Sequence, residues 1–231
     1  MMTPHLSILI RWSLITALLL LLLAVTIELI ATPTVVTAAG VQALVYLILF
    51  VLALLIYGWF ALFRTRTPTR TEQGALRTGT LWGLFCAAAW VAELLIANVM
   101  RPGWGPLYLA LYDGSTFTGF LVPGLASFLV AVRSRHLLSG LQAGLLTGMM
   151  GALAIFLASF LFSALLLQAG QSDPQTLREF AHSGLPDLKT YIVSDYLAGM
   201  IAHLWIGLVT GFFLGLLGGL GGKALAPLPQ A

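Results

Sequence analysis

The sequence predicts an all-α protein of the membrane: a polytopic bundle of six transmembrane helices. Hydrophobic residues make up 59% of the 231 positions and charged residues only 8%, whereas soluble domains carry about 25% charged residues. The mean hydropathy is +0.99. The apolar residues gather in six stretches, most of them close to the roughly 20 residues that a helix needs to cross the hydrocarbon core.

The whole chain, residues 1–231, is expected to form a single membrane domain. The predicted spans cover residues 8–31, 41–63, 79–100, 116–133, 139–168 and 194–219. The first stretch has features of a signal peptide, but it exceeds the 7 to 15 apolar residues usual in one, so we interpret it as a retained span.

Basic residues predict how the bundle is oriented. Eight of the eleven lysines and arginines lie near the start of the first span, after the last, or in the loops at 64–77 and 133–135. Because loops rich in lysine and arginine stay in the cytoplasm, both termini are expected to be cytoplasmic, in a cell membrane of prokaryotic type.

Two segments between the spans are expected to lie on the external side of the membrane. Residues 107–112 are apolar but too short to span, and either a surface helix or a re-entrant segment fits them. Residues 169–193 form an external loop with a short interfacial helix, which Asp173 caps, Pro174 begins and Gly184 follows. This loop is either a lid or a connector.

Small residues recur at four-residue intervals in the last span and in the fifth. In a membrane such rows let two helices approach closely, and the sequence therefore predicts helix packing along them. The last span carries Asp195, Gly199, His203, Gly207, Gly211, Gly215 and Gly219, and the fifth carries Gly140, Gly144 and Gly148.

Ionisable residues within spans are costly, and they often mark a ligand or proton pathway. We therefore expect an outward-facing polar pocket between the first, third and sixth spans. Its candidate ligand-binding or proton-binding residues are Glu93, His203, Asp195, Arg101 and Glu28. The structural alternatives stay open: Glu93 pairs with Arg101, the other acids lie at the lipid headgroups, and His203 is a bonded core histidine.

The sequence indicates no cofactor. Of the four histidines only His203 lies within a span, and Cys86 is the lone cysteine, so neither a bis-histidine haem nor a cysteine-rich metal centre is predicted. No glycine pattern typical of nucleotide binding follows a strand. No nucleic-acid partner is expected either.

Residues 202–217, AHLWIGLVTGFFLGLL, resemble the last helix of rhomboid intramembrane serine proteases, in which a histidine precedes a row of small residues. The resemblance implies a nucleophilic serine paired with His203. The family's Gly-x-Ser-Gly motif is absent, however, and the nearest segment is GLAS at 124–127, with Ser127. The family's histidine and asparagine on the second helix are missing too.

Three functional hypotheses follow. In the first, the protein binds or translocates a small solute or ion through the polar pocket. In the second, it is a non-catalytic accessory subunit whose glycine faces bind a membrane-protein partner or a second copy of the chain. The third, an intramembrane serine protease, is a remote alternative, and an enzyme is not favoured. The lipid bilayer is an expected partner in all three.

Overall fold

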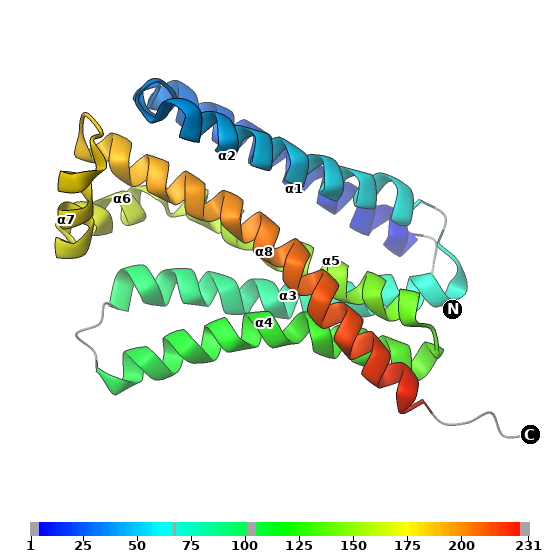
Figure 1. Cartoon of the computed structure of the whole chain (residues 1–231). Coiled ribbons are helices and arrows are strands. Elements are labelled where there is room, and N and C mark those ends of the chain that lie inside the picture. Colours follow the sequence, from blue (N-terminus) through cyan, green and yellow to red (C-terminus); the bar gives the residue numbers. More distant parts are fainter. Residues whose placement is uncertain (1–4, 67, 101–104, 227–231) are drawn as a thin grey trace, which may run out of the picture.

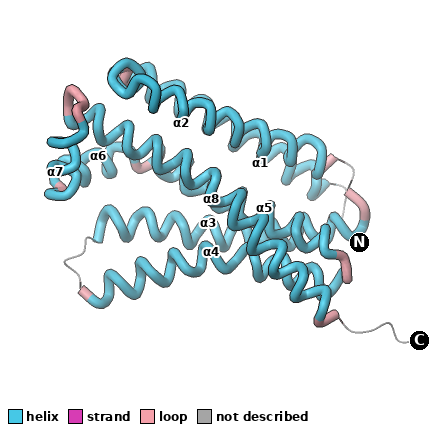
Figure 2. The backbone as a smooth tube through the Cα atoms, viewed as in Figure 1, coloured by secondary structure: helices cyan, strands magenta, loops and turns pink. Residues whose placement is uncertain are grey.

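The computed structural model describes residues 5–66, 68–100 and 105–226, and within these ranges every regular element is a helix (Figure 2). The elements are α1 (His5–Ala31), α2 (Thr34–Trp59), η1 (Phe60–Arg64), α3 (Arg70–Leu95), η2 (Ile96–Met100), α4 (Pro106–Ser134), α5 (Leu137–Leu161), α6 (Ser163–Ser172), α7 (Pro174–Ser183) and α8 (Leu188–Ala224). The two η segments are wide π-helical turns. The predicted all-α class is confirmed.

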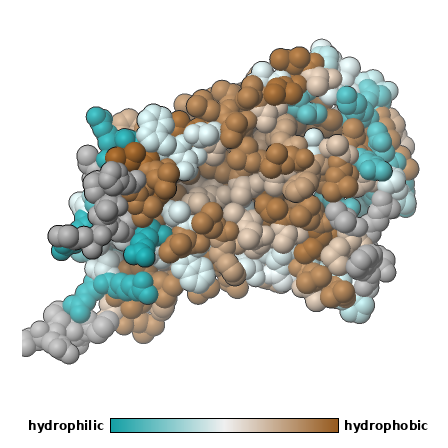
Figure 3. All heavy atoms as spheres, turned by 180° about the vertical axis from the view of Figure 1, so that it is seen from behind, coloured by the Kyte–Doolittle hydropathy of each residue, from teal (hydrophilic) through white to brown (hydrophobic). Residues whose placement is uncertain are grey.

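Six helices are long and apolar enough to cross a membrane, as predicted. They are Leu6–Ala31, Gly40–Arg64, Arg70–Asn98, Pro106–Ser134, Leu137–Leu161 and Leu188–Ala224. A broad hydrophobic band lies between two ends that carry the hydrophilic residues (Figure 3). The chain is therefore a multi-pass integral membrane protein.

The helices form three layers, with α5 and α8 between the α1–α2 hairpin and the α3–α4 pair (Figure 1). In the most apolar 18-residue segment of α5, 67% is buried inside the protein, whereas in that of α1 only 17% is buried. The helix α5 is thus the centre of the bundle and α1 lies at its periphery. Both termini lie at one end, here called the terminal end, and α7 lies at the other, here called the α7 end (Figure 1).

Glycine backbones make the contact between α5 and α8. A Cβ atom placed on Gly144 would lie 2.8 Å from Cα of Gly215, and one on Gly211 would lie 3.0 Å from the carbonyl oxygen of Gly144. Gly148 and Gly207 face each other in the same way. Gly140 instead contacts Ser127 of α4, with 2.8 Å from such a Cβ to the Ser127 carbonyl oxygen. Only glycine permits backbones this close.

Residues 107–112 form neither a surface helix nor a re-entrant segment. They are the first turns of α4, which continues unbroken to Ser134. Pro106 occupies the first turn, where its missing N–H costs nothing, and Gly105 precedes it with a φ of +60°. Residues 107–112 and the predicted fourth span therefore belong to one helix. Its 29 residues are enough to cross the membrane at a tilt.

Among the helix boundaries that differ from the prediction, three have a clear local cause. The helix α5 ends at Leu161 and not at 168, because Phe162 leaves helical geometry at φ −100° and ψ 11°. The helix α3 begins at Arg70 and not at 79, since Thr69 and Glu72 form a capping box. The helix α8 begins at Leu188 and not at 194, since Asp187 caps its first turn.

The loop predicted to hold one short helix carries α7 as its amphipathic helix, with the end of α6 before it. Asp173 accepts a hydrogen bond of 2.9 Å from the Thr176 backbone N–H, and Gly184 follows α7 in the left-handed conformation.

Candidate functional site

Polar side chains from three helices converge at the level of Glu93. Glu93 of α3 and His203 of α8 are both half-buried, and they are close enough for the carboxylate and the imidazole to attract each other. Trp90, one turn before Glu93, meets the His203 ring edge to face, with 6.2 Å between ring centroids. Because Trp90 is itself buried, it fixes one side of the imidazole.

The hydrogen bond of His203 to its own helix defines its free nitrogen. Its Nδ1 lies 2.7 Å from the Gly199 carbonyl oxygen. A carbonyl only accepts, so Nδ1 must carry the proton, and in a neutral ring Nε2 then holds the lone pair. The described residues provide no hydrogen bond to Nε2, which leaves it able to bind a proton, a cation or a donor group.

Thr116 of α4 is the third member of this cluster. Its hydroxyl lies close to the Glu93 carboxyl, yet its buried oxygen meets the geometry of a hydrogen bond with no group in the described part of the chain. The two groups are therefore neighbours without a hydrogen bond. A buried hydroxyl without a partner costs free energy, which a bound polar ligand would recover.

A second polar contact joins η2, α6 and α8 nearer the α7 end. The Tyr196 hydroxyl of α8 contacts the Asn98 side-chain oxygen of η2 at 3.2 Å and donates to the Leu166 carbonyl of α6 at 2.9 Å. The Asn98 amide donates to the Leu94 carbonyl at 2.8 Å. This contact holds the π-turn η2 against α8, directly above Glu93.

The other candidate residues lie elsewhere. Asp195 is exposed and lies near Glu179 of α7. Glu28 lines a cavity between α1, α5, α6 and α8, to which α3 contributes no lining residue. Arg101 lies outside the described residues. The polar cluster is therefore built from the third, fourth and sixth spans (α3, α4 and α8). The first span, which was expected to contribute, takes no part in it.

Sequence reasoning missed Trp90 and Thr116. Trp90 and Glu93 are three residues apart and share a helix face, a signal that was available in the sequence. Thr116 reaches Glu93 only through the register between α3 and α4, which no spacing within one helix encodes.

The serine that the rhomboid resemblance assigned is not near His203. The Ser127 hydroxyl donates to the carbonyl of Gly215, twelve residues further along α8, or roughly 18 Å at 1.5 Å per residue. A Ser127–His203 dyad does not form, so the protease hypothesis loses its nucleophile. Within the described ranges, no three histidine, cysteine or acidic side chains are grouped to hold a metal ion.

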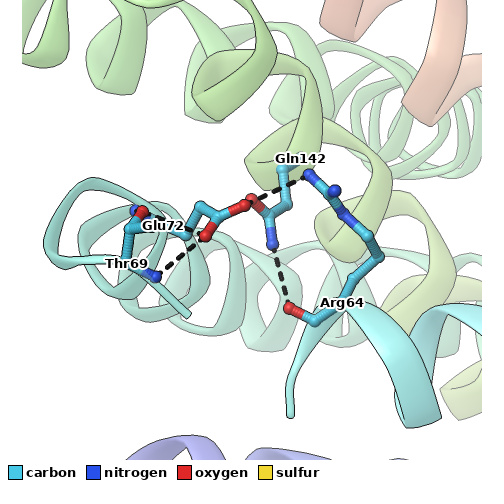
Figure 4. A network of polar contacts seen from close by, with 4 residues as sticks. All are labelled: Arg64, Thr69, Glu72 and Gln142. Carbon is cyan, nitrogen blue, oxygen red and sulfur yellow. Dashed lines mark hydrogen bonds and ion pairs between the residues drawn. The ribbon is translucent and has the colours of Figure 1, made fainter. Parts of the chain in front are cut away.

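A second polar network lies at the terminal end (Figure 4). The Arg64 guanidinium pairs with Glu72 at 3.4 Å, and the Gln142 amide donates to the Arg64 carbonyl at 3.4 Å. Glu72 also accepts bonds from the backbone N–H and the hydroxyl of Thr69. These bonds fasten η1 and the start of α3 to α5, so we assign the network a structural role.

Comparisons with protein-family models, curated proteins and solved structures give no match.

Proposed function

We propose that this integral membrane protein binds or translocates a small solute or ion, with Glu93 and His203 as its binding or protonation pair. The observation that carries the proposal is the convergence of Glu93, Thr116 and His203 from three helices within the apolar band. An acid facing an imidazole with a free nitrogen suits a proton or a small cation best.

The cost of burying these groups supports a binding role. A charged side chain at the centre of the bilayer costs about 2.5–3.5 kcal/mol on insertion scales, so such groups face partners or water and mark functional sites. Glu93 gains an electrostatic partner in His203 but no ion pair within the described ranges.

The site belongs to the α7 end of the bundle. We propose that this end faces outward and the terminal end faces the cytoplasm, on the strength of the basic residues of the loops and termini at the terminal end. Entry to the Glu93 cluster is then from outside, past Asn98 and Tyr196.

The accessory-subunit alternative receives less support. It relied on the glycine faces for binding a partner, but Gly144, Gly148, Gly207, Gly211 and Gly215 contact one another across α5 and α8 of the same chain. Those faces are not available to a second protein.

The test uses the purified chain in liposomes, with proton, sodium and potassium fluxes measured under imposed gradients. Glu93→Gln and His203→Ala are expected to lower the transported flux about tenfold or more, since losing a hydrogen bond to a charged group costs about 1.5–3 kcal/mol. Asp113→Asn is the matched control, because Asp113 is an exposed acid on α4 near the same end.

A second readout reports binding without transport. Cation binding at His203, beside the Trp90 ring, should change the Trp90 fluorescence, seen as a step with rising cation concentration in the difference between the wild type and Trp90→Phe. The step should vanish in His203→Ala. If both variants leave the three fluxes and this step unchanged, the proposal fails.

A further inference from the structure

Two apolar cavities flank α1 at the α7 end, away from the Glu93 cluster. The first, of about 160 Å³, lies between α1, α5, α6 and α8 and is lined mainly by apolar side chains such as Leu166 and Met200. The second, of about 190 Å³, lies between α1, α2 and α8. They share Leu197 of α8 as a wall, and they are reached from adjacent faces of α1, at Glu28 and Leu29.

One acid and one base line the first cavity without pairing. Glu28 is half-buried and Lys189 is exposed, and both line the cavity. Among the described residues, the ion pair is the one between Arg64 and Glu72. Neither Glu28 nor Lys189 therefore has an ion-pair partner there. Asp187 attracts Lys189 electrostatically but forms no ion pair with it. A carboxylate and an ammonium at the rim of an apolar cavity are each left for another partner.

We propose that this site binds a diacyl phospholipid whose zwitterionic headgroup carries a primary ammonium. Its phosphate accepts from Lys189, its ammonium donates to Glu28, and its two acyl chains enter the two cavities on either side of α1. The site belongs to a single leaflet, that of the α7 end, and it adjoins the proposed entry to the Glu93 site at Tyr196, which also lines the first cavity.

The chemistry of the two charges selects this headgroup. An anionic headgroup without a cation would satisfy Lys189 but leave Glu28 facing like charge. A quaternary ammonium would balance Glu28 but has no N–H to donate, whereas a primary ammonium offers three donors. Ion pairs with such donors are shorter and stronger than neutral hydrogen bonds.

Packing supports a lipid in this place. The helix α1 is the least buried of the six spans, and in a membrane helices associate through van der Waals contact and not through the hydrophobic effect. A bound lipid would fill the gaps between α1 and α8 and add contacts that the protein lacks there.

The experiment is native mass spectrometry of the full-length purified chain with phosphatidylethanolamine, phosphatidylglycerol or phosphatidylcholine of equal acyl length. The wild type is expected to bind the ethanolamine lipid at least about fivefold more tightly than either of the others. Glu28→Gln and Lys189→Ala should each lower that affinity about fivefold, and Lys189→Arg should retain it. Asp113→Asn and Lys223→Ala are controls that remove one exposed charge elsewhere.

A second arm tests the acyl chains. Ala164 lines the first cavity and Ala198 the second, so tryptophan at either position should reduce lipid occupancy. Leu62→Trp, at an exposed apolar position near the terminal end, should not. Equal binding of the three lipids, or full binding of the ethanolamine lipid by both charge variants, would overturn the proposal.

Discussion

At the scale of single residues, the missing side chains of glycine determine how close α5 and α8 lie. A Cβ on Gly207 would fall 2.6 Å from the Ala152 Cβ, below any distance that two carbon atoms sustain. On the same helix α8, Gly199 has nothing within 4 Å of such a Cβ. The two glycines belong to one row in the sequence, but only Gly207 is in a contact that leaves no room for a side chain.

Gly148→Ala is therefore expected to destabilise the protein. The added Cβ would overlap the Gly207 carbonyl oxygen, which is backbone and cannot turn aside, and overpacking of this kind costs about 1–3 kcal/mol. The thermal unfolding midpoint in mild detergent should fall. Gly199→Ala is the matched control, and it should leave the midpoint unchanged or raise it, because alanine favours the helix interior. Equal midpoints for the two variants would contradict the assigned backbone contact.

Only part of the Glu93 cluster could be predicted from the sequence. Glu93 and His203 stand out because each is an ionisable side chain inside an apolar run, and a cost of several kcal/mol needs a reason. Glu28 and Asp195 carry the same signal, yet the structure places them in other surroundings. The difference lies in helix rotation and packing order, which depend on contacts among α1, α5 and α8 that no local pattern reports.

At the scale of elements, helix ends depend on capping more than on hydrophobicity. The six spans were predictable because a 20-residue apolar run has few alternatives to a membrane helix. Their ends were not, since Asp187 and Thr69 begin α8 and α3 in polar segments. Phe162, which separates α5 from α6, is as apolar as its neighbours, so the interruption has no compositional signal.

The cap of α8 leads to a prediction about pH. The Asp187 carboxylate accepts bonds from the Thr190 hydroxyl at 2.6 Å and from its backbone N–H at 2.9 Å, and these bonds lower the pKa of Asp187 below its ordinary value. Because the folded pKa is lowered, the stabilisation of the helix end is present above the unfolded pKa, about 3.9, and is lost as the pH falls through the folded pKa.

Hydrogen exchange at the Thr190 amide checks this prediction. Its protection factor should be constant near neutral pH and should fall below about pH 4. Asp187→Asn keeps a capping oxygen without a titratable proton, so its protection factor should not change with pH, and Asp187→Ala should be weakly protected throughout. The same acid-induced loss in Asp187→Asn would assign it to another group.

At the scale of the whole molecule, the α1–α2 hairpin is attached to the remaining helices by few polar bonds. Tyr57 donates to the Leu204 carbonyl at 2.9 Å, and Trp205 donates to the Leu49 carbonyl at 3.1 Å. Near the α7 end, the Thr34 and Thr190 hydroxyls are 2.6 Å apart. The core of α3, α4, α5 and α8 holds the Glu93 cluster, whereas the hairpin borders the cavities of the proposed lipid site. The two proposals thus concern different groups of residues, which meet at Tyr196 of α8.

The orientation of the bundle in the membrane is a prediction that concerns the entire chain. An even number of spans brings both termini to one end, as the structure has them, and the excess of arginine in the loops at that end predicts that it is cytoplasmic.

Thiol labelling checks this orientation. His136→Cys at the terminal end and Ser183→Cys on α7 would place one exposed thiol at each end. In intact cells a membrane-impermeant maleimide should label Ser183→Cys at once, and should label His136→Cys only after permeabilisation. The wild type is the control, because its single thiol, Cys86, is buried and should stay unlabelled. The reverse labelling order would place the Glu93 cluster in the cytoplasmic half of the membrane and would reverse the direction from which its ligand enters.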